Sequence, residues 1–110
     1  MALFKREHLQ KILAGGKTQT RRLHGDGWKV GRVYGLRSRR FEKAQHHIVI
    51  TRRFKQRLGD ISIKDVQKEG FRTLEQFQAA WVRIHGGWNP DKIVTAYEFK
   101  LLVSSRSRKV

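Results

Sequence analysis

The chain has 110 residues, 38% of them apolar, which is the length of one domain with enough apolar material for its own core. It has no cysteine, which excludes a disulfide framework, a thiolate zinc site and a cysteine nucleophile. Twenty-five lysines and arginines against nine acidic residues give a net charge of +16. This charge favours a polyanionic partner, with nucleic acid first. A highly basic, solvated protein that binds RNA only incidentally is the alternative.

The apolar pattern argues against two further classes of protein, membrane-spanning and secreted. No stretch of about 18 apolar residues is present to span a membrane. The N-terminal segment also lacks the long apolar run of a secretory signal. An anionic membrane surface fits poorly as a partner, because no expected helix combines a wide apolar face with a basic one. We therefore expect a cytoplasmic protein that does not bind membranes.

The first expected element is a helix over residues 4–14, whose apolar face repeats at three- and four-residue spacing. This face consists of Phe4, His8, Leu9, Ile12 and Leu13. Gly15 and Gly16 end the helix, because glycine readily adopts the left-handed conformation of a helix C-terminus. Within the next six residues come Lys17, Thr18, Thr20, Arg21 and Arg22. Such a turn presents amine, hydroxyl and guanidinium groups together, and these can hold a phosphate, a nucleobase or a polarised carbonyl.

Three strands are expected next, over residues 18–23, 29–37 and 45–54. The expected buried residues of the second strand are Val30, Val33 and Tyr34. Alternation in the third strand predicts that Ile48, Ile50 and Phe54 share one face.

The C-terminal half is expected to hold two helices and a strand. Ser62 caps a short helix over 63–68 that ends at Gly70, and a Thr73–Gln76 capping box opens a helix through Ile84. The apolar stripe of the second helix is Leu74, Phe77, Ala80, Trp81 and Ile84, so Trp81 is expected in the core. A loop over 85–90 leads to a strand over 93–103. The expected fold is α+β, a small, partly open β-barrel with flanking helices, over residues 1–103. Residues 104–110 form a basic tail that is expected to fray.

Aromatic and basic side chains offer contacts to nucleic acid outside the turn. Trp28 and Trp88 lie in glycine-rich loops, where exposed rings could stack on bases. Arg39 belongs to a basic run at 37–40, and Arg53 belongs to another at 52–57. On neighbouring strands these runs would form a track for phosphates; the alternative is a solvated surface. The five histidines show no metal-ligand spacing, so neither a metal nor another cofactor is expected.

The turn and four further segments resemble the ASCH domain of the PUA-like superfamily. The turn matches the family pattern Gly-x-Lys-Thr-x-Thr-x-Arg at Gly15, Lys17, Thr18, Thr20 and Arg22. The other segments are Leu3-Phe4-Lys5, Arg57-Leu58-Gly59-Asp60, Lys68-Glu69-Gly70-Phe71, and Trp88-Asn89-Pro90 followed by Ala96-Tyr97-Glu98-Phe99. The resemblance covers nearly the whole chain, to about Leu102. It implies a PUA-like β-barrel with a cleft beside the turn, in a family regarded as RNA-binding.

The resemblance also implies a specific chemistry. A small bacterial branch of the family is an amidohydrolase that removes the acetyl group from N4-acetylcytidine, and its Lys, Thr and Glu correspond here to Lys17, Thr20 and Glu69. Another bacterial relative is thought to be a ribonuclease, so fold alone does not fix the chemistry. This chain differs from the branch by Arg21 and by its high positive charge. Strand alternation also predicts that Lys17 and Thr20 lie on opposite faces, unless the turn still curls there.

These observations predict an RNA- or nucleoside-binding domain that acts in RNA metabolism and holds its ligand at the turn. Its ligand-binding residues are expected to be Gly15, Gly16, Thr18, Arg21, Arg22, Trp28, Arg39, Arg53 and Trp88. The alternatives are an amidohydrolase acting on a modified cytidine and an interaction module without a nucleic-acid role. The oligomeric state is left open.

Overall fold

The computed structural model describes residues 2–39 and 42–102, which form a five-stranded mixed sheet with helices beside it. The elements in chain order are β1 (Ala2–Leu3), α1 (Arg6–Leu13), β2 (Gln19–Arg22), β3 (Val33–Arg37), β4 (His46–Arg57), the 3-10 helix η1 (Leu58–Asp60), α2 (Ile63–Lys68), α3 (Leu74–His85) and β5 (Ile93–Leu101). The predicted helices and strands are present; β1 and η1 are additional. Arg40, the tail at 104–110 and the end of the predicted last strand at 103 lie outside the described residues.

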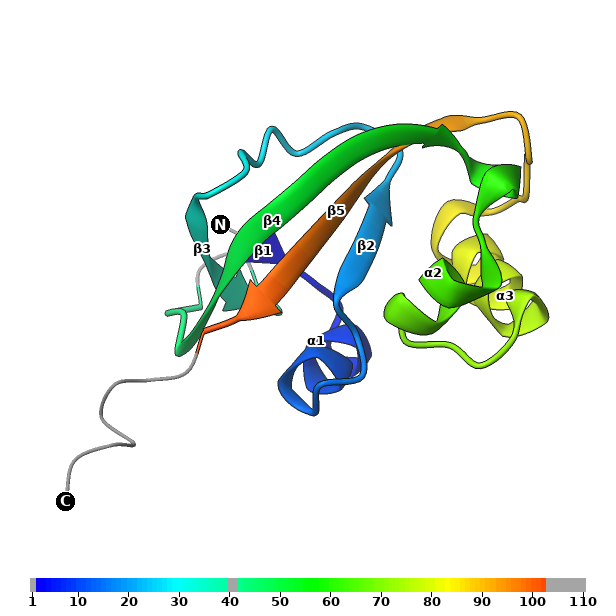
Figure 1. The fold of residues 1–110 in the computed structure, drawn as a ribbon. Coiled ribbons are helices and arrows are strands. Elements are labelled where there is room, and N and C mark those ends of the chain that lie inside the picture. Colours follow the sequence, from blue (N-terminus) through cyan, green and yellow to red (C-terminus); the bar gives the residue numbers. More distant parts are fainter. Residues whose placement is uncertain (1, 40–41, 103–110) are drawn as a thin grey trace, which may run out of the picture.

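The sheet has the strand order β1-β3-β4-β5-β2 and forms a curled half-barrel, so the predicted α+β class is confirmed. β4 and β5 are long antiparallel neighbours that curve across the molecule, with β2 beside β5 at one edge (Figure 1). β1 pairs in parallel with β3 at the opposite edge. No helix in the described part of the chain is long and apolar enough to cross a membrane.

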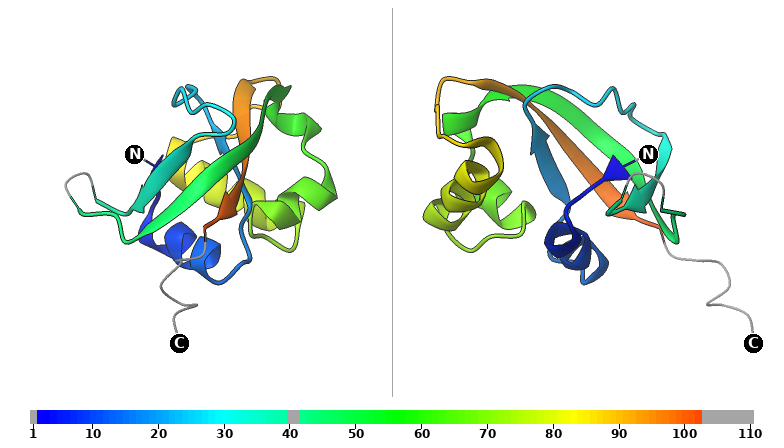
Figure 2. Two further views of the ribbon diagram at one scale, coloured as in Figure 1. Left: turned by 60° about the vertical axis from the view of Figure 1, so that its left-hand side comes forward. Right: turned by 180° about the vertical axis from the view of Figure 1, so that it is seen from behind.

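Two apolar cores lie along this sheet. The first core joins α1 and the N-terminal segment to the sheet, and its buried residues are Ala2, Phe4, Ile12, Trp28, Leu36, Ile48, Ile50, Tyr97 and Phe99. The second core joins α2 and α3 to the region where β4 ends and β5 begins, and its buried residues are Leu58, Ile61, Val66, Phe77, Trp81 and Val94. The right-hand view of Figure 2 shows α2 and α3 at one end of the sheet and α1 nearer its middle.

A β-bulge in β4 overturns the prediction that Phe54 shares a face with Ile48 and Ile50. Ile50 pairs with Phe99 of β5, but the next paired residue is Arg52, opposite Glu98. This extra residue reverses the alternation of β4. Phe54 therefore lies on the opposite face from Ile50, where its ring contacts the guanidinium groups of Arg21 and Arg52.

The predicted burial of the second strand was also partly wrong. Val30 and Val33 are exposed and Tyr34 is only half-buried, whereas Leu36 is in the core. The cause is a turn at Gly31, where a φ of 85° delays the strand to Val33 and changes which side chains face inward. Leu13, at the end of the predicted apolar face of α1, is exposed as well.

Candidate ligand pocket beside the edge strand

A cavity of about 300 Å³ lies along the edge strand β2, between the two cores. Its lining residues come from the N-terminal segment, α1, β2, the end of α2 and α3, with Ser38 after β3. They are Leu3, Phe4, Lys5, His8, Lys17, Thr20, Arg21, Arg22, Ser38, Glu69, Phe71, Phe77, Ala80, Trp81, Ile84 and His85. The lining combines an aromatic and aliphatic wall with a small group of charged side chains, as in many small-molecule sites.

The charged group centres on Glu69, whose carboxylate is shared by two buried cations. Lys17 Nζ lies 2.9 Å from Glu69 Oε1 and also donates to the Glu69 carbonyl oxygen at 3.1 Å. Arg21 donates to Glu69 Oε2 at 3.0 Å. The three side chains are at most 5% exposed. Both cations depend on the Glu69 carboxylate, because a buried charge without a partner costs several kcal/mol.

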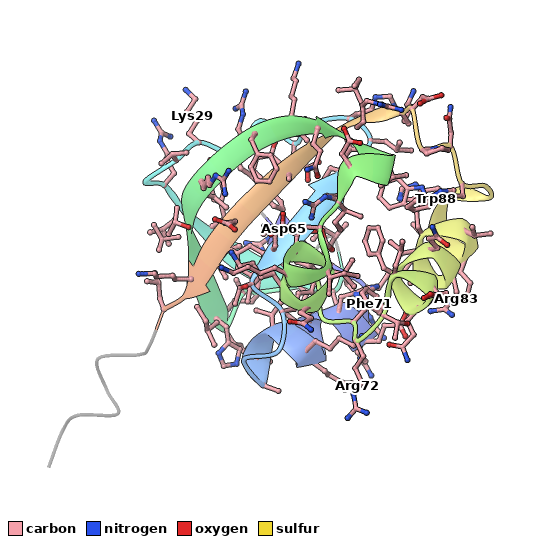
Figure 3. All side chains as sticks on the ribbon, turned by 45° about the vertical axis from the view of Figure 1, so that its right-hand side comes forward. Lys29, Asp65, Phe71, Arg72, Arg83 and Trp88 are labelled. Carbon is pink, nitrogen blue, oxygen red and sulfur yellow. The ribbon has the colours of Figure 1, made fainter. Side chains whose placement is uncertain are left out.

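Further polar residues extend this cluster under β2. Arg21 donates to Gln56 Oε1 at 2.9 Å and to Asp65 Oδ2 at 3.4 Å, and it contacts the Gln19 side-chain oxygen. Gln19 in turn donates to Glu98 at 2.8 Å. Figure 3 shows Asp65 on α2 beside the sheet. Arg21 is therefore held in place on several sides and serves as a fixed part of the cavity floor.

Burial changes the acid–base properties of Lys17. Removal from water lowers the pKa of its amine, with smaller contributions in the same direction from the charges of Arg22 and Lys11. The Glu69 carboxylate opposes this shift by its charge and its hydrogen bond. The pKa of Lys17 is lowered overall, so its neutral amine forms at a lower pH than in a free lysine.

Arg22 forms a second cationic feature at the cavity. Its guanidinium lies over the rings of Phe4 and Trp28, at 4.7 and 5.0 Å from their centroids. It donates to the Leu3 carbonyl oxygen at 3.0 Å and pairs with Asp26 at 3.3 Å. Two aromatic faces and a backbone oxygen thus fix Arg22 with its head group partly open to solvent.

Lys17 and Thr20 line the same cavity although they face opposite sides of the sheet. Thr20 pairs with Tyr97 and shares its face, whereas Gln19 and Arg21 face α2, and Lys17 binds Glu69 on that same side. Because β2 is an edge strand, a cavity along its open side borders both faces. The predicted alternation is therefore confirmed, and the two residues border the same cavity from opposite faces of β2.

Glu69 is positioned by the way in which α2 begins and ends. The Ser62 side chain accepts a hydrogen bond from the Asp65 backbone and caps the helix, as predicted. Glu69 is the C-terminal cap, and Gly70 follows with a φ of 97°. At Gly70 a Cβ atom would lie 3.0 Å from Lys11 Cδ and 3.5 Å from Lys17 Cβ.

We expect Gly70→Ala to lower the free energy of unfolding by more than Gly86→Ala. Gly86 has a φ of 85° but open space where a Cβ atom would lie, so its replacement measures the left-handed backbone cost alone, about 1–2 kcal/mol. Gly70→Ala adds crowding against Lys11 and Lys17. Urea denaturation of both variants tests this, and equal losses would contradict a close approach at Gly70.

The structure separates the other predicted ligand residues into several groups. Arg21 and Arg22 line the cavity, whereas Gly15, Gly16 and Thr18 are exposed and outside its lining. Gly15, with a φ of 84°, ends α1 as predicted. The three residues assigned by the resemblance, Lys17, Thr20 and Glu69, all line the cavity, and Lys17 and Glu69 form an ion pair there.

The two loop tryptophans lie elsewhere. Trp28 is 3% exposed in the first core, so the prediction of an exposed stacking ring there is wrong; its ring packs on Tyr97 at 4.9 Å between centroids. The glycines around Trp28 suggested an exposed loop, but they also allow the backbone to turn the indole inward. Trp88 is half-buried against Phe77 and lines a second hollow. Figure 3 shows Trp88 beside α3.

The two basic runs do not form one track across neighbouring strands. Leu36 pairs with His46 at the start of β4, so Arg37 and Arg39 lie near that end. Arg53 lies in the other half of β4, opposite Tyr97 of β5. At about 3.3 Å per residue, seven residues from His46 to Arg53 separate them by roughly 20 Å. Both Arg39 and Arg53 are exposed.

Sequence reasoning missed Gln19, Gln56 and Asp65 as parts of the buried cluster. Only Asp65 had a usable signal: it lies four residues before Glu69, which places both carboxylates on one side of α2. Gln19 and Gln56 come from separate strands, and their contact with Arg21 depends on the register of β2 and β4 with β5.

Comparison with known proteins shows a structural likeness. No protein-family model matches the chain, and no curated protein matches its sequence. The chain is similar to the crystal structure of an ASCH domain from Lactobacillus crispatus JV V101, with a TM-score of 0.68 and 20% identity over 86% of this chain and 70% of that one. It is also similar to a DUF984 protein from Enterococcus faecalis V583, with a TM-score of 0.62 and 17% identity over 89% and 68%. The chain has the fold of an ASCH domain.

Proposed function

We propose that this chain is a member of the small RNA-linked ASCH group and binds a nucleoside unit of RNA in the cavity beside β2. The observation that carries the proposal is the buried Lys17–Glu69–Arg21 cluster on one side of an aromatic-walled cavity. Charged groups fix the orientation of a polar ligand, and aromatic side chains offer a surface to a planar base.

The size of the cavity and the net charge of the chain support binding of one nucleoside in the cavity and of the rest of an RNA on the surface. About 300 Å³ is at the small end of the range for small-molecule sites, which suits one nucleoside better than several. The rest of an RNA would lie on the surface of a chain with net charge +16. Arg53 on β4 and Arg39 after β3 are exposed cations that phosphates could reach.

We expect binding of a short single-stranded RNA to weaken steeply with salt, while binding of an uncharged nucleoside changes little. Each phosphate contact contributes about −0.7 to the slope of log K against log salt for a single strand. Arg53→Gln is expected to reduce the slope by about that amount. Lys64→Gln, an exposed position on α2, serves as the control. Calorimetric titration at several salt concentrations measures both slopes. A flat dependence for RNA would remove the phosphate contacts from the proposal.

A second function is favoured by one specific observation: Lys17, Thr20 and Glu69 line the same cavity, and the pKa of Lys17 is lowered. These groups could hydrolyse the N-acetyl amide of a modified cytidine. Because the two side chains face opposite sides of β2, the Thr20 hydroxyl would pass its proton to Lys17 Nζ through one water as it attacks the acetyl carbonyl carbon. The C–N bond then breaks, the leaving amine takes the proton from Lys17, and water hydrolyses the Thr20 acetyl ester to acetate. Glu69 would orient Lys17 throughout.

A further inference from the structure

His8 in α1 is a polar residue of the cavity lining that the buried ion cluster does not include. Both of its ring nitrogens are buried, and neither has a hydrogen-bond partner among the described residues. The Glu7 carboxylate, 3.9 Å from His8 Nε2, is too far away for a hydrogen bond. The ring instead lies edge-on to Phe71, with 6.3 Å between centroids. A buried group without partners destabilises the free protein, and a ligand could supply the missing partner if the imidazole turns toward the cavity, since neither nitrogen is accessible in the free protein.

We propose that His8 hydrogen-bonds the polar edge of the base in the bound nucleoside and thereby determines specificity. This inference rests on the proposed nucleoside site. A neutral imidazole presents one N–H donor and one acceptor nitrogen, the same pair of functions that nucleobase edges offer. Burial, followed by the positive charge of Lys17, lowers the pKa of His8, which favours the neutral ring.

The aromatic wall next to His8 indicates which part of the ligand, base or ribose, lies near its ring. Phe71, Phe77 and Trp81 line the cavity in sequence, with centroid separations of 5.9 Å from Phe71 to Phe77 and 6.2 Å from Phe77 to Trp81. The rings are inclined to one another by 69° and 40°, so they form an angled aromatic wall, and an apolar wall of this kind suits a heterocycle better than a ribose. The charged cluster at Lys17 and Glu69 lies in the same cavity, so a base on this wall would have polar groups at its edge.

The test compares His8→Phe, His8→Gln and the control His24→Phe by calorimetric titration with cytidine and with free cytosine. His24 is exposed and outside the cavity lining. His8→Phe is expected to weaken both ligands by about tenfold, the effect of one lost hydrogen bond. His8→Gln, which keeps a donor and an acceptor, is expected to retain more affinity. His24→Phe is expected to change nothing.

A second readout separates ligand binding from a structural role. Because His8→Phe removes unpartnered buried nitrogens, the free variant is expected to be as stable to urea as the parent protein, or more stable. A loss of stability together with unchanged affinity would overturn the inference. Weakened cytidine binding with unchanged cytosine binding would also overturn it, since His8 would then contact the ribose. If His8→Phe binds both ligands normally while Lys17→Met does not, the proposed role of His8 is contradicted and the nucleoside site is supported. If the parent protein binds neither ligand, both proposals fail.

Discussion

Replacing Glu69 with glutamine is expected to lower the free energy of unfolding by about 3 kcal/mol or more. Glutamine keeps the shape of the side chain but removes the anion shared by Lys17 and Arg21, whose side chains are 3% and 0% exposed. At position 69, Lys17 would then have only neutral oxygens to donate to, among them the backbone carbonyl at 3.1 Å. Breaking a buried ion pair from one side costs this much because the remaining charge is left unpaired in a poorly solvated place.

The control is Asp91→Asn, which removes the anion of a surface pair with Arg57. Those side chains are 74% and 52% exposed, so the expected loss is below about 1 kcal/mol. Urea denaturation measures the free energy of unfolding of both variants and of the double variant Lys17→Met/Glu69→Gln. The double variant is expected to regain part of the stability, since it also removes the stranded ammonium. A loss below about 1 kcal/mol for Glu69→Gln would show that the cluster contributes little to the fold.

The order of elements could be predicted because it depends on local signals. Capping residues began two helices and a glycine ended another where expected: Ser62 and Thr73 are the N-caps of α2 and α3, and Gly15 follows α1. The errors have a common cause in irregular backbone. The bulge after Ile50 and the turn at Gly31 each shift the inward-facing residues, and neither produces a periodic signal that a sequence window can detect.

The candidate site could be predicted only in part, because its members are far apart in the chain. Lys17 and Glu69 are 52 residues apart and meet through the packing of α2 against β2. The resemblance supplied both residues, whereas spacing alone would not have joined them. The burial of Trp28 was not predictable from its glycine-rich surroundings, because burial of an aromatic ring depends on space in the first core.

Hydrolysis of N4-acetylcytidine, if this protein performs it, is expected to fall about 100-fold or more in Lys17→Met, as expected on loss of a general base. Thr20→Val is expected to abolish the reaction by removing the hydroxyl, while Thr20→Ser retains part of it. The matched control is Thr18→Val, the same chemical change at an exposed position outside the cavity lining. Cytidine release, followed by chromatography on variants shown to be folded, measures all four.

The pH dependence of this reaction provides a separate test of the role of Lys17. A base must be unprotonated, so the rate is expected to rise with pH and to level off below pH 10.5, the ordinary lysine pKa, because the pKa of Lys17 is lowered. Any residual rate in Lys17→Met should lose this dependence, whereas Thr20→Ser should keep it. A parent protein that binds N4-acetylcytidine without releasing cytidine at any pH would exclude the hydrolase. The same result would leave the buried Lys17–Glu69 pair as a binding element, because an ion pair can orient a base without accepting a proton from Thr20.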